Sequence, residues 1–269
     1  TMSEPNQTVQ PDEMGEQQLS ELLQIRRDKL QALRLYDQYR DLITTAPLEI
    51  IYSGSAELDR VRQALAAAFA TLPREEVRTI ADAVPHVCRE SVQTVEDEME
   101  VTQGKLSMGF SCGSDDMPAL LLGNTLFGGS SNSKLFLNVR EKLSLCYYAS
   151  SMYHRQKGII TVSSGIEFQN YQRAYDEILS QLAAVQNGEL EEWELAGARS
   201  TLLNSYATVG DSQGKLENFY LGQAATGRSE TPADLAQAVM EVSAERICRA
   251  MSTVKLDTVY FLKGKEAQA

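Results

Sequence analysis

The sequence predicts an α+β fold, in which a largely antiparallel β-sheet carries helices on one face. Three observations indicate this fold class. Short apolar strands are separated by pairs of amphipathic helices, two of the strands follow each other directly as a hairpin, and the strand–helix–strand rhythm of a parallel sheet is absent. The chain has 269 residues, 43% of them hydrophobic, which is enough for a substantial core.

The N-terminal part of the chain is expected to be helical around one short strand. Residues 1–18 are polar and predict an arm, and a loose apolar stripe predicts a charged helix over 19–44. The apolar run Leu48–Tyr52 predicts a short buried strand. Apolar residues at every third or fourth position predict a second helix over Leu58–Leu72, with Ser55 as its cap.

The central part predicts a strand, two helices and a hairpin. Apolar and polar residues alternate over 105–112, as in a half-buried strand. Asp116 begins a helix that ends at the pair Gly128-Gly129, and a second helix is expected over Lys134–Lys142 with Ser133 as its cap. Two apolar segments around a short polar turn predict the hairpin: Cys146–His154 and Ile159–Ile166.

The C-terminal part predicts five helices and a last strand. The clearest helix lies between Asn170 and Gly188 and has one apolar face. The remaining elements follow in order: helices over Glu189–Tyr206, Gly214–Thr226, Ala233–Val242 and Ala244–Thr253, and a strand over Leu256–Leu262.

Residues 35–54 and 245–264 share a weak internal similarity. Both segments read as a helix, a short break, an apolar strand and a glycine. Matches this short also arise by chance. A duplicated module of about 200 residues is the more informative interpretation.

The overall charge excludes a nucleic-acid-binding protein, since 25 basic and 37 acidic residues give a net charge of −12. The polar opening residues predict no signal peptide, and the longest uncharged stretch, Met117–Ser133, is interrupted by proline and glycine, so no membrane span is expected. Four widely spaced cysteines predict reduced thiols in a cytoplasmic protein. A fragment that lacks its targeting segment remains the alternative.

Most of the candidate chemical motifs favour a structural interpretation. His86 and His154 both lack the second histidine of a zinc-peptidase motif, so no metal ligand is expected. The glycine-rich segment before Lys134 follows a helix and lacks the spacing of a phosphate-binding loop. The acidic run Glu189–Glu194 predicts a helix N-terminus. Cys146 is expected to be a packed strand thiol.

Arg140 and the tyrosines that follow it are the exception. Arg140 lies near the end of a predicted helix, just before a strand that begins with Cys146, Tyr147 and Tyr148. A guanidinium group and a phenol that converge from these two elements could hold a carbonyl or a carboxylate. A surface arginine paired with Glu141 or Asp115 is the alternative.

The segment around Arg140 carries a family resemblance. GNTLFGGSSNSKLFLNVREKLSLCYYASS (123–151) resembles the C-terminal domain of the pitrilysin/insulinase family of inverted-zincin peptidases, and is most similar to its short bacterial members. The similarity covers most of residues 35–264, and Ser144 stands where many members have glycine. The matching motif positions are Phe127-Gly128-Gly129, Ser133-Lys134-Leu135-Phe136, Arg140-Glu141-Lys142 and Leu145-Cys146-Tyr147.

The resemblance implies two related α+β modules that enclose a chamber. The first module of active members binds zinc, and the second contributes an arginine and a tyrosine that bind the peptide backbone; by position these are Arg140 and Tyr147. The implied organisation is a polar arm and charged helix over 1–34, the end of a first module over 35–89, and a C-terminal peptidase-like module over 90–269.

The function implied by the resemblance is a substrate-contacting domain of a zinc-dependent peptidase that is not catalytic by itself. Zinc is expected only in a partner or in a missing N-terminal module, and this chain itself is expected to hold no cofactor. The expected partners are a peptide substrate and a zinc-bearing module or homologous subunit, without nucleic acid or membrane. Two alternatives remain: an inactive family member that acts as a scaffold or partner subunit, and an enzyme that acts alone through Cys146 or Glu90.

Overall fold

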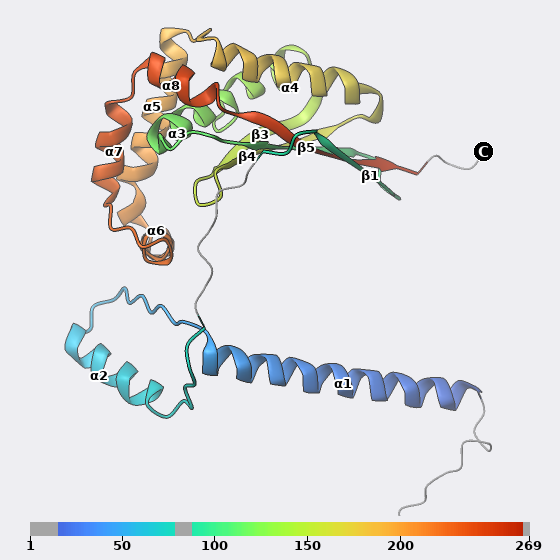
Figure 1. The fold of residues 1–269 in the computed structure, drawn as a ribbon, viewed down its shortest axis with the longest axis vertical. Coiled ribbons are helices and arrows are strands. Elements are labelled where there is room, and N and C mark those ends of the chain that lie inside the picture. The colour runs from blue at the N-terminus through green and yellow to red at the C-terminus, as the bar shows by residue number, and fades with distance from the viewer. Residues whose placement is uncertain (1–15, 79–87, 266–269) are drawn as a thin grey trace, which may run out of the picture. The chain divides into compact units, whose positions relative to one another are not determined.

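The computed structural model describes residues 16–78 and 88–265, which divide into two compact units, residues 1–81 and 82–269 (Figure 1). The first unit contains helices α1 (Glu16–Thr45) and α2 (Leu58–Phe69), close to the two predicted helices. Most of the arm expected over 1–18 lies outside the described residues. The helix α2 begins after Glu57 without a side-chain cap, so the prediction of Ser55 as its cap is wrong.

The C-terminal end of α1 is held by the chain that follows α2. The Arg74 guanidinium donates hydrogen bonds to the carbonyl oxygens of Ile43 and Ala46 at 2.7 and 2.5 Å. Arg78 forms a bidentate ion pair with Asp41 at 2.6 and 2.8 Å. The Arg74 bonds satisfy carbonyl groups at the end of α1, where the helix itself supplies no partner, and the Arg78 pair adds a side-chain contact to the same end.

The strand predicted at Leu48–Tyr52 does not form in the described chain. The segment joins no β-ladder, and Leu48, Ile50 and Tyr52 are 45%, 50% and 40% exposed. An apolar pattern specifies a strand only when a neighbouring strand satisfies its backbone groups and a helix layer covers its side chains. Within the described residues this unit provides no such neighbour.

The second unit contains a five-stranded sheet in the order β1-β5-β2-β4-β3. The strands are β1 (Gln93–Met99), β2 (Gly104–Ser111), β3 (Cys146–His154), β4 (Ile159–Ile166) and β5 (Lys255–Gly264). Only β1 and β5 pair in parallel, and the other three pairs are antiparallel.

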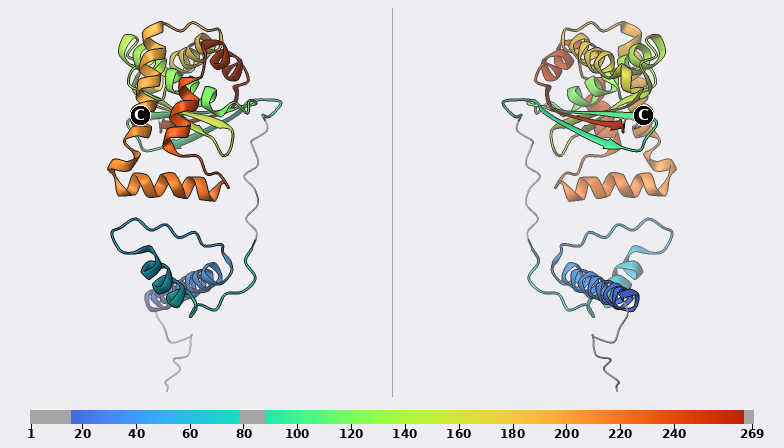
Figure 2. Two further views of the ribbon diagram at one scale, coloured as in Figure 1. Left: turned by 90° about the vertical axis from the view of Figure 1, so that its left-hand side faces the viewer. Right: turned by 90° about the vertical axis from the view of Figure 1, so that its right-hand side faces the viewer.

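Most of the helices of this unit lie on one side of the sheet, as both views in Figure 2 show. Alternate residues of β2 are buried, including Leu106, Met108 and Phe110, and Phe110 packs edge-on against Phe127 of α3. The helices are α3 (Met117–Phe127), α4 (Tyr171–Gln186), α5 (Glu192–Ala207), α6 (Gln213–Ala225), α7 (Pro232–Met240) and α8 (Ala244–Met251). The predicted α+β fold, with its largely antiparallel sheet and one-sided helix layer, is confirmed.

Strand β1 has no counterpart among the predicted elements. All seven of its residues are exposed, and its sequence QTVEDEM is acidic, so it lacks the apolar alternation that marks a strand. It forms because β5 provides a backbone partner along its whole length, from Gln93 opposite Thr258 to Met99 opposite Gly264.

None of the helices in the described ranges combines the length and the apolar character that a membrane crossing requires.

Candidate functional site

Arg140 lies on an unusual helix. The segment η2 (Leu135–Lys142) is a π-helix, where the sequence predicts an ordinary helix. Its last turn is wide, because the Leu143 amide donates to the Asn138 carbonyl, five residues back. Two residues after the helix, Ser144 has a φ of 50°, which lies in the left-handed region that favours glycine. Glycine would adopt this conformation without steric cost.

Tyr147 occupies a β-bulge at the start of β3. Cys146 pairs with Ile166, but the next pair joins Tyr148 to Gly165, so Tyr147 is one extra residue in the ladder. A bulge of this kind changes the direction of the side chains around it. Tyr147 and Tyr148 are accordingly both exposed, at 58% and 40%.

The structure brings Arg140 and Tyr147 to one cavity. This cavity has a volume of about 410 Å³, and Glu141, Ser144 and Glu167 also contribute to its wall. A larger cavity of about 670 Å³ extends along β3, with walls from Arg140, Gly128–Ser131, Phe136, Tyr148 and Met152. Arg140 lines both cavities.

Two contacts restrain the Arg140 side chain. Its guanidinium carbon lies 4.7 Å from the centre of the Phe136 ring, within the range of a cation–π contact. Its nearest carboxylate is that of Glu141, at 3.6 Å, and both side chains are substantially exposed. The ion pair with Glu141 is therefore present but long, and a guanidinium group has five N–H donors, more than this one contact uses.

The outer edge of β3 is partly closed by the loop after α3. The Ser151 amide donates to the Gly128 carbonyl at 2.9 Å. A Cβ atom on Gly128 would lie 2.8 Å from the Ser151 amide nitrogen, so this approach requires glycine. Ala149 lies two residues before Ser151 and presents its amide to the same edge. Within the described residues β3 pairs only with β4, and its edge beside Arg140 is open.

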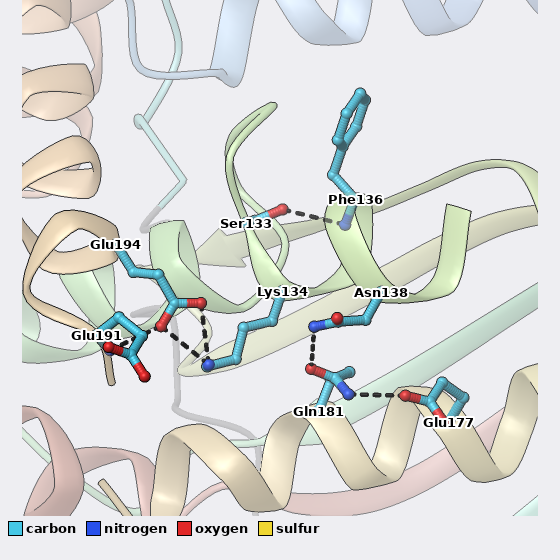
Figure 3. A network of polar contacts seen from close by, with 8 residues as sticks. All are labelled: Ser133, Lys134, Phe136, Asn138, Glu177, Gln181, Glu191 and Glu194. Carbon is cyan, nitrogen blue, oxygen red and sulfur yellow. Dashed lines mark hydrogen bonds and ion pairs between the residues drawn. The ribbon is translucent and has the colours of Figure 1, made fainter. Parts of the chain in front are cut away.

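Lys134 and the acidic run have structural roles. The Lys134 ammonium lies 3.0 Å from both carboxylate oxygens of Glu194, and both side chains are buried (Figure 3). Glu194 and Glu191 form the capping box that begins α5, so the predicted helix N-terminus is confirmed. Lys134 thus has a carboxylate partner within the protein and does not point to a phosphate.

The thiol groups near the site are poor nucleophiles. Burial raises the pKa of the Cys146 thiol, although a hydrogen bond with Ser164 and the charge of Arg140 act in the opposite direction. Burial raises the pKa of Cys112 to about 12. Both thiols are therefore protonated at neutral pH, which is unfavourable for thiolate chemistry. Glu90 is exposed and does not line either cavity.

His154 does not form a metal centre with its described neighbours. His154 lies at the end of β3, and its Nε2 is 3.0 Å from the Thr161 hydroxyl. His86 lies outside the described residues. Over residues 16–78 and 88–265, no group of three or more histidine, cysteine or acidic side chains is close enough together to bind a metal ion.

Three parts of the site were not predicted from the sequence. Phe136 could have been found, because it precedes Arg140 by one turn of a helix. The β-bulge at Tyr147 has no clear signal in the sequence. Glu167 reaches the smaller cavity only because the β3–β4 hairpin returns the chain to the start of β3.

Comparisons with known proteins match most of the chain to one family. The family model described as "Peptidase M16 inactive domain" matches residues 29–202. The chain is 36% identical, over 245 residues, to the "Probable inactive metalloprotease YmfF" of Bacillus subtilis; the match covers 89% of this chain and 57% of that protein.

Solved structures agree with this match. A conserved protein from Enterococcus faecalis is 28% identical, with a TM-score of 0.68, over 77% of this chain and 50% of its own. A peptidase M16 inactive domain from Pseudomonas fluorescens has the same fold at 16% identity, with a TM-score of 0.65, over 80% of this chain and 53% of its own. The chain thus spans about half the length of these relatives.

Proposed function

The chain belongs to the peptidase M16 family, as an inactive domain, and on this basis we propose that it holds an extended peptide for a zinc-bearing module. The family match agrees with the resemblance of segment 123–151. The proposed role is substrate contact without catalysis. The observation that carries it is that Arg140 and Tyr147 line one cavity beside the open edge of β3.

The geometry suits a peptide backbone. An extended peptide can add to a sheet edge through main-chain hydrogen bonds, which bind without demanding a particular sequence. Arg140 carries several donors in a fixed fork, and Tyr147 adds a hydroxyl, so together they suit peptide carbonyl oxygens. The two cavities on either side of Arg140 provide room for side chains of the peptide.

The zinc ion belongs, in this proposal, to another module or subunit. Such an ion would polarise the scissile carbonyl group and activate water. Residues 35–89 would be the end of a first module and residues 90–269 the second, with the arm and charged helix over 1–34 preceding them. The exposed apolar side chains of Leu48–Tyr52 support this division, because they suit a strand whose sheet lies elsewhere. The four free cysteines support a cytoplasmic location.

Peptide binding by single-site variants tests the proposal. The probe is a fluorescein-labelled dodecapeptide with blocked termini, selected from a random library for binding to the whole chain. We expect Arg140→Ala to weaken binding by about tenfold or more, since hydrogen bonds to charged groups contribute about 1.5–3 kcal/mol. Tyr147→Phe is expected to weaken it less. Fluorescence anisotropy measures both dissociation constants.

Strand β5, which pairs with the opposite edge strand β1, provides matched controls. Lys263→Ala removes a cation, and Tyr260→Phe removes a phenol that donates to Asp97 at 3.0 Å. Neither residue lines either cavity, so both variants should bind the probe as the wild type does. A library that yields no binder, or equal affinity for the wild type and Arg140→Ala, would contradict the proposal.

A second candidate function is a scaffold or partner subunit without peptidase activity in the whole assembly. The description of the Bacillus relative as a probable inactive metalloprotease favours it. Zinc analysis and peptide cleavage by the full gene product distinguish the two. A zinc-loaded product that cleaves peptides supports the peptidase, whereas a zinc-free product that binds peptide without cleavage supports the scaffold.

A further inference from the structure

We propose that the Lys134–Glu194 ion pair and the Asn138–Gln181 hydrogen bond are positioning contacts, which fix the direction of Arg140 toward the bound peptide. This inference rests on the proposed peptide-binding function and adds residues that neither line the smaller cavity nor touch the peptide. Both contacts attach η2 to the helix layer, as Figure 3 shows.

The ion pair attaches the start of η2 to α5. The two side chains are only 9% and 7% exposed, and the Lys134 ammonium is equidistant from both oxygens of Glu194, at 3.0 Å. Glu194 is itself fixed, because its Oε2 accepts a hydrogen bond from the Glu191 amide at 2.9 Å. The cation therefore binds to a carboxylate that is held by the first turn of α5.

The hydrogen bond attaches the middle of η2 to α4. The Asn138 side-chain amide donates to Gln181 Oε1 at 2.7 Å. Gln181 in turn donates from Nε2 to Glu177 at 2.7 Å, which keeps its oxygen directed at Asn138. Lys134 and Asn138 are about one helical turn apart, so η2 is held at two points by two different helices.

Stability alone is a poor reason for the buried ion pair. Two charges lose their hydration when they are buried, and an apolar pair of similar volume is often equally stable or more stable. An ion pair also fixes the relative position of the two helices that carry it, because it forms only when the two charged groups meet. Buried polar pairs of this kind are best known for fixing the register of packed helices.

The register of η2 decides where Arg140 points. A π-helix turns less per residue than an α-helix, since its hydrogen bonds span five residues instead of four. A change to the α-helical register would rotate Phe136 and Arg140 about the axis relative to Lys134 and Asn138. In Figure 3, Phe136 points away from the side on which Lys134 and Asn138 lie. Anchors on that side therefore determine the direction of the Phe136–Arg140 pair.

A double-mutant cycle on peptide binding tests the inference. Lys134→Met with Glu194→Met replaces the ion pair by apolar side chains, and the dodecapeptide serves as the probe. We expect the paired substitution to weaken binding about tenfold in the wild-type background and to have no further effect in Arg140→Ala. A merely structural role would weaken binding equally in both backgrounds. Asn138→Ala is a milder second variant, with the same expected dependence on Arg140.

Arg246→Met is the control variant, because it removes an ion pair of 2.9 Å with Asp116 at the start of α3, away from η2. We expect it to bind the probe as the wild type does. Wild-type affinity in both η2 variants, or equal weakening in both backgrounds, would overturn the positioning role while Arg140→Ala still weakens binding. Loss of the Arg140→Ala effect itself would instead overturn the proposed function.

Discussion

The two outer strands of the sheet, β3 and β1, show how similar edges acquire different properties. Both strands pair on one side only within the described residues. The β3 edge adjoins η2 and the loop after α3, which build two cavities around Arg140. The β1 edge is exposed on all seven residues and carries Glu96, Asp97 and Glu98. Charged side chains on an exposed edge discourage pairing with other strands. Peptide binding is therefore expected at β3 and not at β1.

The largest expected effect compares the buried Lys134, at the start of η2 beside β3, with the partly exposed Lys263 of β5, beside β1. Lys134→Met leaves Glu194 buried without its cation and should lower the free energy of unfolding by about 3–5 kcal/mol. Lys263→Met removes exposed ion pairs with Glu96 and Glu98, which should leave stability unchanged. Urea unfolding, followed by circular dichroism, measures both. Adding Glu194→Met to the first variant should restore most of the loss, and equal effects of the two lysines would contradict the comparison.

A glycine substitution tests the close approach that shapes the β3 edge. A Cβ on Gly128 would lie 2.6 Å from the Leu135 side chain and 2.8 Å from the Ser151 amide nitrogen. Gly128→Ala should therefore destabilise the protein by about 1–3 kcal/mol.

The matched control is Gly109→Ala in β2, where the nearest atom would lie at an ordinary 3.8 Å. This variant should change the free energy of unfolding less than Gly128→Ala, since it adds no steric conflict. Thermal unfolding of both variants gives the difference. If Gly128→Ala lowers the stability less than Gly109→Ala does, the close approach of the loop to β3 does not require glycine at position 128.

The smallest expected effect concerns the residue between η2 and β3. Ser144→Gly relieves a left-handed conformation that costs a non-glycine residue about 1–2 kcal/mol, although glycine loses more backbone entropy on folding. We expect a net gain of about 0.5–1 kcal/mol in the free energy of unfolding, measured in urea. A loss of stability would mean that the Ser144 hydroxyl contributes more than its backbone conformation costs.

Local sequence patterns predicted most of the helices and strands. The exceptions are segments whose structure depends on whether a neighbouring strand pairs with them. The segments 48–52 and 256–260 have similar apolar patterns, yet only the second forms a strand, because β1 and β2 lie on either side of it. Strand β1 is the opposite case, because it forms without a strand-like sequence pattern. Its acidic residues do not predict a strand, and pairing with β5 produces one. Contacts between distant residues are absent from local patterns, which explains both errors.

The candidate site also has features that the sequence predicted and features that depend on packing. Arg140 and Tyr147 both lie within the segment 123–151, whose family resemblance identified them. The structure places both at one cavity. The π-helical turn and the β-bulge that direct their side chains were not predicted, since both depend on packing. Lys134 is a further example, because its partner Glu194 lies on another helix.

Hydrogen exchange of the backbone amides, with and without the bound dodecapeptide, directly tests whether a peptide adds to the edge of β3. A peptide that adds to the edge of β3 will slow exchange at Ala149, whose amide faces that edge, and leave the amides of β1 unchanged. The Arg140→Ala variant should show weaker protection at the same peptide concentration. Protection along β1, or no change at Ala149 in the saturated complex, would contradict peptide addition at β3.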